Sequence, residues 1–391
     1  MKDSKSPHDW VAKHIASLPK SGIRDFFELV NSMGDVISLG IGEPDFTTPW
    51  HIREATIYAL NRGFTNYTSN LGDLRLRKAV CNYAKENFAM SCRPDTECII
   101  TVGVSEGLDL LLRAVLNPGD EVLYHEPCYV SYAPSIRMTH AVPVPVQTTE
   151  AHDFVLQVAD LEAKVTPRTR VLMLNYPNNP TGAGLTLEDK KALADFAIRH
   201  NLLVVSDEIY EELNYIPRCP SIASLPGMKE RSVLLNGFSK AFAMTGYRIA
   251  YALGHPAIID AMMKIHQYSM LCASSIAQAG ALEALQNGQE PREAMRTEYE
   301  QRRNVIVRRL NEMGLTCFIP RGAFYVFPCI RSSGLTSYGF ATRLLQEKKV
   351  AVIPGTAFGA CGEGFVRCAY ATSLEDIETA MLRIREFLAE L

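Results

Sequence analysis

The chain contains 391 residues, of which 47% are hydrophobic and 21% charged, and its formal net charge is −3. A chain of this length exceeds the size at which a single hydrophobic core keeps growing, so we expect a large domain and a smaller one. The composition is that of an ordinary globular protein and no basic block stands out, which argues against nucleic acid and against an anionic membrane as partners.

The first ten residues are polar, and nowhere does the sequence approach the roughly eighteen uninterrupted apolar residues of a membrane span. We therefore expect a cytoplasmic protein. Its ten cysteines are scattered and include no CxxC pair, a pattern typical of reduced thiols. Neither a disulfide framework nor a metal site is expected.

Helical patterning extends to about Asp35, residues 38–46 read as a strand that turns into a loop, and a helix is predicted over 51–62. Short apolar strands then alternate with helices. Near-continuous apolar runs such as 202–205 suit strands covered on both faces, so we predict an α/β fold with a doubly wound, mainly parallel sheet. The predicted strands are 98–102, 121–125, 141–147, 170–176, 202–207, 233–237 and 248–254, and the predicted helices are 105–116, 130–137 and 187–200.

After Pro256 the pattern changes and predicts a smaller α+β domain. We set the domain boundaries at 1–45 for an N-terminal segment packed with the small domain, 46–285 for the large domain and 286–391 for the small one. The predicted elements are helices over 257–286, 292–313 and 337–348, strands near 350–353 and 364–370, and a last helix from Ser373.

Several polar residues follow the ends of predicted strands, where parallel sheets bind their ligands. Val104 and Ser105 open a helix, so free backbone N–H groups, a hydroxyl and the positive end of the helix would suit a phosphate. Ser105 could equally be only an N-cap. Asn179 lies in a turn rich in asparagine and proline, which by itself need be no more than a turn.

Three charged residues stand in apolar surroundings. Asp207 ends an apolar strand, where an ionised carboxylate needs a cationic partner such as a ligand or a lysine, unless it caps the next helix. A lone lysine such as Lys240 is more often a surface residue, but apolar surroundings and a nearby cation would lower its pKa and make it a nucleophile. Arg367 lies in an apolar strand and wants a planar carboxylate, from a ligand or from an internal acid.

The stretch 234–250, LLNGFSKAFAMTGYRIA, resembles the lysine signature of the class I and II pyridoxal-phosphate (PLP) aminotransferases: Gly or Ser, two residues, lysine, and arginine eight positions further on. The G-E-P-D-F stretch at 42–46 and the N-P-T-G turn at 179–182 are also similar to that family. The motifs occur in family order over nearly the whole chain. The resemblance implies the PLP-dependent transferase fold, PLP as cofactor, and a homodimer whose active site is shared between subunits.

By this resemblance Lys240 holds PLP as a Schiff base, Asp207 pairs with its ring nitrogen, and Tyr210 completes the catalytic set. Gly237 stands where many relatives have a phosphate-binding serine, and Val104 replaces a frequent glycine, so backbone groups or a neighbouring serine must serve there. The implied cofactor contacts are Lys240, Val104, Ser105, Tyr129, Asn179, Asp207, Tyr210, Ser239, Arg248 and Tyr67 of the partner subunit; the implied substrate contacts are Gly42, Tyr129, Asn179 and Arg367.

The implied activity moves the amino group of an L-amino acid to a 2-oxo acid in a ping-pong cycle, with glutamate and 2-oxoglutarate as the expected pair. A PLP-dependent carbon–sulfur β-lyase stays open as the alternative, because it shares the early proton abstraction. A PLP-sensing regulator is disfavoured because it needs a preceding DNA-binding segment, and a catalytically dead binding module would not be expected to keep the charged residues of the site together. Residues that could shape substrate choice, although each is more often structural, are Arg24, Phe26, Phe27, Tyr325 and Tyr370.

Overall fold

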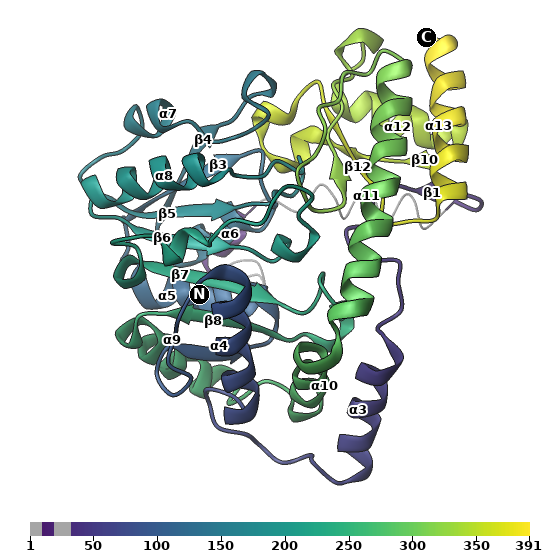
Figure 1. The fold of residues 1–391 in the computed structure, drawn as a ribbon. Helices are drawn as coiled ribbons and strands as arrows, with labels where there is room; N and C mark the ends of the chain where they lie inside the picture. Colours follow the sequence, from purple (N-terminus) through teal and green to yellow (C-terminus); the bar gives the residue numbers. More distant parts are fainter. Residues whose placement is uncertain (1–9, 19–32) are drawn as a thin grey trace, which may run out of the picture.

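The computed structural model describes residues 10–18 and 33–391, and in them a seven-stranded sheet is the largest (Figure 1). Its strand order is β2-β8-β7-β6-β5-β3-β4; β8 runs antiparallel to both neighbours and every other pair is parallel. All seven predicted strands are present, so the doubly wound, mainly parallel sheet is confirmed. The strands are β2 (Cys98–Thr101), β3 (Glu121–Glu126), β4 (Val142–Gln147), β5 (Thr169–Asn175), β6 (Leu203–Asp207), β7 (Ser232–Gly237) and β8 (Ala250–Gly254).

Helices cover both faces of this sheet because its strands are apolar on both sides. Successive residues of a strand point to opposite faces. Val171 and Met173 of β5 therefore belong to a core shared with α5, α6 and α9, whereas Leu172 and Leu174 belong to the core on the side of α8. The helices around the sheet are α3 (Trp50–Asn61), α4 (Leu74–Phe88), α5 (Gly103–Val115), α6 (Tyr132–Met138), α7 (Val158–Glu162), α8 (Leu187–Arg199), α9 (Pro256–Ser269) and α10 (Ser275–Asn287).

Two helix boundaries correct the sequence analysis. The single helix predicted over 257–286 is two helices, α9 and α10, because Leu271 adopts a φ of 67° and the Ser274 side chain caps a new helix. Helix α5 begins at Gly103 with Val102 as its N-cap residue, so Ser105 lies in the first turn and is not the cap. The hydroxyl of Ser105 therefore does not cap the N terminus of this helix.

The second group of elements follows α11 (Gln289–Glu312), a long helix that runs from α10 toward α12 (Ser337–Lys348) and α13 (Leu374–Ala389) (Figure 1). Antiparallel strands form a small sheet of order β11-β12-β9, made of β11 (Ile353–Pro354), β12 (Val366–Ala369) and β9 (Tyr325–Val326).

The segment after residue 33 is joined to these C-terminal elements. β1 (Ile37–Ser38) pairs in parallel with β10 (Val350–Ala351), and the backbone of Leu39 bonds to both Ala351 and Ala369. Residues 10–18 hold only the short helix α1 (Lys13–Ala16). The domain division at residues 45 and 285 stays a prediction.

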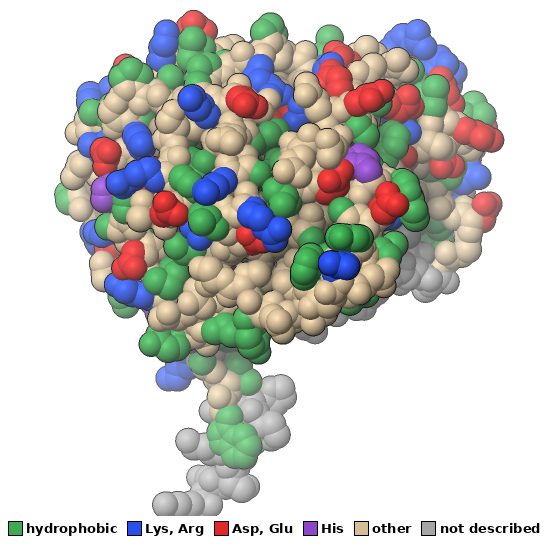
Figure 2. Space-filling model, turned by 60° about the horizontal axis from the view of Figure 1, so that its bottom comes forward, with side chains coloured by type: hydrophobic (Ala, Val, Ile, Leu, Met, Phe, Trp, Pro, Cys, Tyr) green, Lys and Arg blue, Asp and Glu red, His purple; other side chains and the backbone are tan. Residues whose placement is uncertain are grey.

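None of the helices within residues 10–18 and 33–391 combines the length and the apolar character that crossing a bilayer requires. On the face drawn in Figure 2, Lys and Arg side chains are interspersed with Asp and Glu, and apolar side chains lie between them. That face therefore presents mixed charge.

Candidate active site

A cavity of about 430 Å³ lies where several strands of the large sheet end and β12 approaches them. The carboxyl ends of parallel strands meet at one edge of a sheet, so residues far apart in the sequence converge there. Tyr67 lies outside the cavity with 80% of its surface exposed. The other predicted residues all line it: Gly42, Val104, Ser105, Tyr129, Asn179, Asp207, Tyr210, Ser239, Lys240, Arg248 and Arg367.

Lys240 follows β7 in a turn rather than in a helix, and its Nζ donates a hydrogen bond to the carbonyl oxygen of Gly42 at 2.7 Å. Burial, partly offset by the carboxylate of Glu43 and assisted by the charge of Arg367, lowers the pKa of Lys240 to about 8. A larger share of this amine is therefore neutral near pH 7 than for an exposed lysine. The neutral amine is the form that can act as a nucleophile or accept a proton.

Asp207 is the last residue of β6 and is buried. Its Oδ2 accepts a hydrogen bond from the Tyr132 hydroxyl at 2.7 Å and its Oδ1 accepts one from the backbone N–H of Ile209 at 3.2 Å. Burial raises the pKa of Asp207 to about 6, although the hydrogen bond from Tyr132 opposes this. Its two oxygens are thus held by a tyrosine and a backbone amide rather than by a lysine, which leaves the carboxylate open to a cationic ligand.

Arg367 of β12 is buried and forms no ion pair with an acid among the described residues. Its Nη1 donates to Asn179 Oδ1 at 3.0 Å and its Nη2 to the Gly40 carbonyl at 2.6 Å, while its Nε has no partner in residues 10–18 and 33–391. Burial lowers the pKa of this guanidinium. An unpartnered, buried N–H beside a second N–H is the arrangement that a carboxylate ligand satisfies through two parallel bonds.

A third part of the cavity combines features that bind anions. Gly103 has a φ of +78°, and a Cβ there would lie 2.6 Å from Nη2 of Arg248, so only glycine lets the guanidinium approach the start of α5. The first backbone N–H groups of that helix have no partner within it. Ser105 and Ser239 add hydroxyls beside them. A cation, a helix N terminus and two hydroxyls together make a site for phosphate.

The aromatic side chains divide between the cavity and the core. Tyr129 is 37% exposed and meets the Tyr132 ring edge-on at 5.7 Å. Tyr325 lines the cavity, whereas the Tyr370 hydroxyl donates to the Ala323 carbonyl at 3.1 Å inside the core. Tyr370 therefore does not line the site as suggested from sequence. The other residues suggested for substrate choice, Arg24, Phe26 and Phe27, lie outside the described residues.

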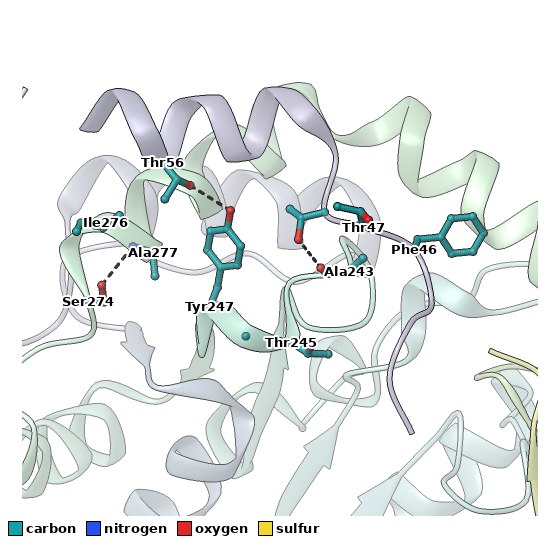
Figure 3. A pocket seen from close by; sticks show the side chains of 11 residues that line it. Phe46, Thr47, Thr56, Ala243, Thr245, Tyr247, Ser274, Ile276 and Ala277 are labelled. Carbon is teal, nitrogen blue, oxygen red and sulfur yellow. Dashed lines mark hydrogen bonds between the residues drawn. The ribbon is translucent and has the colours of Figure 1, made fainter. Parts of the chain in front are cut away.

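A second hollow, of about 590 Å³, borders the first (Figure 3). Thr245 lines both, so the loop that leads to Arg248 forms a wall between them. The hydroxyl of Thr48 donates to the Ala243 carbonyl, and that of Thr56 donates to the Tyr247 hydroxyl at 3.4 Å. These bonds tie the loop after Lys240 to α3 and to the segment just before it.

The sequence analysis missed Tyr132, the donor to Asp207, although Tyr132 belongs to the same short stretch as Tyr129. It also missed Asn175, whose side-chain amide donates to the backbone carbonyl of Asp207 at 3.0 Å. Asn175 ends β5 beside Asp207 in the strand register. Its place at a strand end, next to the predicted site, was the available signal.

Comparison with known proteins identifies the family. The family model for aminotransferase class I and II matches residues 34–384. A putative aminotransferase YugH of Bacillus subtilis is 48% identical over 379 residues, covering 97% of this chain and 98% of that protein. An aspartate aminotransferase of Pyrococcus abyssi is 45% identical, covering 95% of this chain and 96% of that protein. The crystal structure of an aromatic aminotransferase from Pyrococcus horikoshii has a TM-score of 0.90 and 45% identity, covering 94% of this chain and 99% of that one.

The chain belongs to the class I and II aminotransferase family. It is an aminotransferase, which moves the amino group of an amino acid to a 2-oxo acid. The two relatives at 45% identity carry different substrate names, aspartate and aromatic, so similarity of this degree does not decide the amino donor.

Proposed function

We propose that the cavity binds PLP together with a substrate amino acid, and that this chain's activity depends on both. The observation that carries the proposal is the convergence of Lys240, whose pKa is lowered to about 8, with the buried Asp207 and with Arg367, whose Nε lacks a partner in the described part of the chain. Lys240 would react with an aldehyde, Asp207 would pair with a cation, and Arg367 would pair with a carboxylate. PLP and an amino acid would supply all three.

The donor set fits PLP in its parts. When bound, PLP supplies an aldehyde for attachment to an amine and a ring that accepts electrons. Lys240 would make the covalent attachment through Nζ, and Asp207 would keep the ring nitrogen protonated. The remaining groups would hold the rest of the cofactor: Val104, Ser105, Ser239 and Arg248 its phosphate, Asn179 and Tyr210 its phenolic oxygen, and Tyr129 the ring face.

The residues on the substrate side would orient and move one proton. Arg367 would fix the α-carboxylate through its guanidinium N–H groups, with Gly42 and Asn179 beside it. This would bring the substrate's Cα near the amine of Lys240, whose Nζ lies 2.7 Å from the Gly42 carbonyl oxygen. In its neutral form Lys240 would accept the proton from Cα at Nζ and deliver it to the cofactor side, and in the second half of the cycle it would carry a proton to Cα of the product amino acid.

The amino acid and 2-oxo acid pair we propose is glutamate with 2-oxoglutarate. The pair is proposed from the resemblance to the family, because among the described residues that line the cavity the cations are Lys240, Arg248 and Arg367, and all three already have proposed roles. Aromatic rings line the same space through Tyr129 and Tyr325. The amino donors to compare are therefore glutamate, aspartate and the aromatic amino acids.

An absorbance spectrum of the purified protein tests cofactor and donor together. We expect a visible band that falls when a good amino donor is added without an oxo acid, as a near-ultraviolet band rises. Lys240→Ala should lose the band and the activity, whereas Lys264→Ala, a change on the exposed face of α9, should keep both. No visible band after PLP is supplied would sink the proposal. A band that persists while pyruvate and ammonia form from a β-substituted amino acid would favour the lyase instead.

We also propose a homodimer in which Tyr67 of the partner subunit completes the phosphate site. Large apolar side chains are exposed along α3 and the segment after it, and Asn70 of that segment bonds to the Leu271 carbonyl at 2.7 Å. This continuous surface would be buried by a second copy. The side chains are Trp50, Ile57, Tyr58, Leu60, Phe64, Tyr67, Tyr268, Met270 and Leu271.

Mixing two impaired variants tests the shared site. Dimers exchanged between Lys240→Ala and Tyr67→Ala would contain one native site, so the mixture should exceed the summed activity of the two. The matched control mixes Lys240→Ala with Asp207→Ala, whose hybrids contain no native site because both residues belong to the same subunit's site. Equal results from the two mixtures, or a monomer by sedimentation, would contradict the proposal.

We place the protein in the cytoplasm, because its ten cysteines are free thiols in the structure and free thiols persist in a reducing compartment. Fractionation of cells that express a tagged chain tests this. Recovery of the protein outside the cytoplasm would contradict it.

A further inference from the structure

Tyr325 of β9 is buried, lines the cavity, and touches groups on both sides of it. We propose that Tyr325 is a positioning residue that couples the cofactor side of the site to the substrate side: its hydroxyl holds Tyr210 and the loop of Gly42, and its ring holds Arg367. This inference rests on the proposed function, because the residues it positions have roles only if PLP and an amino acid bind there.

The hydroxyl makes the contacts on the cofactor side. It lies 2.9 Å from the Tyr210 hydroxyl, within hydrogen-bond distance. It also lies close to the backbone of Gly42, since a Cβ added there would be only 2.8 Å from the Tyr325 oxygen. The carbonyl of that same Gly42 accepts the hydrogen bond from Lys240 Nζ at 2.7 Å. The Tyr325 oxygen therefore lies next to the residue whose carbonyl holds the lysine.

The ring makes the contact on the substrate side. The Arg367 guanidinium lies 4.6 Å from the centre of the Tyr325 ring and 4.8 Å from that of Phe358. Stacking of this kind fixes the plane of a guanidinium without using its N–H donors, which stay available for a carboxylate. Nε of Arg367 is one such donor, with no partner among the described residues.

The strand register explains why the two side chains meet. Tyr325 of β9 pairs with Ala369 of β12, and Arg367 is two residues before Ala369 on that strand. Residues two apart in a strand point to the same face, as do residues directly opposite each other. Tyr325 and Arg367 are thus held on one face of the small sheet by backbone pairing.

The two roles belong to different atoms, so two substitutions separate them. Tyr325→Phe removes the hydroxyl and keeps the ring, whereas Tyr325→Leu removes both. We expect Tyr325→Phe to lower kcat about three- to tenfold, the effect of one hydrogen bond, with KM for the amino acid within about twofold. Tyr325→Leu should in addition raise that KM about tenfold. Tyr338→Phe, at an exposed tyrosine of α12, is the matched control and should change neither constant.

A double-mutant cycle keeps the proposal testable if Tyr325→Leu fails to fold. The kcat losses of Tyr325→Phe and Tyr210→Phe should be less than additive when combined, because both remove the same hydrogen bond. Full additivity, or a raised KM with unchanged kcat in Tyr325→Phe, would overturn the coupling. These outcomes are read in variants that keep the visible band, so they are distinct from failure of the proposed function, which would show as a missing band in the unaltered protein.

Discussion

Two groups of buried charges, one around Glu212 and one in the cavity, differ in how their charges are satisfied. Glu212 is 3% exposed and accepts a hydrogen bond from Tyr83, and it forms ion pairs with Arg218 at 2.7 Å and Arg292 at 3.2 Å. In the cavity, by contrast, Asp207 and Arg367 have no oppositely charged partner at ion-pair distance within residues 10–18 and 33–391.

The contrast shows how a buried charge can be assigned to folding or to binding. Charge removed from water is costly unless a partner compensates it, and the Glu212 cluster supplies all its partners from the chain. In the cavity, Asp207 and Arg367 have hydrogen-bond partners but no oppositely charged partner among the described residues. A charge that the fold buries and leaves incompletely paired is a candidate for contact with a ligand.

The largest loss of activity is expected at Lys240. Replacing Lys240 by Met should lower transamination by about 10³- to 10⁴-fold, because it removes the group that transfers the proton. The turnover of the purified variant, in the presence of added PLP, measures this. Activity within tenfold of the unaltered protein would show that another group moves the proton.

At Asp207 the substitution tests the role of the negative charge alone. Asp207→Asn keeps the shape and should lower kcat by about 10²- to 10³-fold, since a preorganised charge that stabilises the reacting ring is lost. Steady-state kinetics with a saturating amino donor measure it. An unchanged kcat would remove Asp207 from the catalytic set.

Arg367 should affect binding more than turnover. Arg367→Leu should raise KM for the amino acid by about 100-fold, the loss of a bidentate, charge-assisted pair, and should change kcat far less. Initial rates across a range of amino acid concentrations separate the two constants. A fall in kcat with KM unchanged would contradict a role in holding the carboxylate.

The pH dependence of stability in the protein without cofactor gives a smaller effect. The pKa of Lys240 is lowered from 10.5 to about 8, so between these values the unfolded chain binds more protons than the folded one. The penalty for burying this amine is therefore fully present below pH 8 and disappears as the pH rises toward 10.5. Lys240→Met should thus stabilise the cofactor-free protein at pH 7 by about 1–3 kcal/mol and by little near pH 10.5. Denaturant unfolding of both proteins at the two pH values measures this, and a pH-independent difference would contradict it.

The smallest expected effect on turnover is at Glu212, where the effect on stability is large. Glu212→Gln leaves Arg218 and Arg292 without their carboxylate, which should cost about 3–5 kcal/mol of unfolding free energy. The folded variant should keep kcat within about twofold, because this group lies outside the cavity lining. Unfolding and kinetics on one preparation give both values. A variant as stable as the unaltered protein would contradict the claim that the ion pairs of Glu212 stabilise the fold.

Much of the fold and the site could be read from local patterns. The apolar run at 202–205 predicted β6, and the position of Asp207 at its end predicted where this residue would face. The break at Leu271 could not be predicted, because hydrophobic periodicity continues across it while the backbone turns left-handed.

The missed features are contacts between distant segments. Tyr132 and Asp207 are 75 residues apart, and Arg367 bonds to the carbonyl of Gly40 across 327 residues. A side chain's partner across the fold depends on how strands and loops are placed in three dimensions, which hydrophobic pattern does not report. For the same reason Tyr325 looked like one aromatic residue among several.

The close approach of Gly42 to the Tyr325 oxygen also constrains how this sequence can diverge. A methyl group at position 42 would collide with that oxygen at 2.8 Å, while the space would open if the residue at 325 were Phe. The two positions are therefore expected to be coupled: Ala at 42 should cost less where residue 325 lacks the hydroxyl than where it is Tyr. Libraries that vary one position at a time would miss the viable pair.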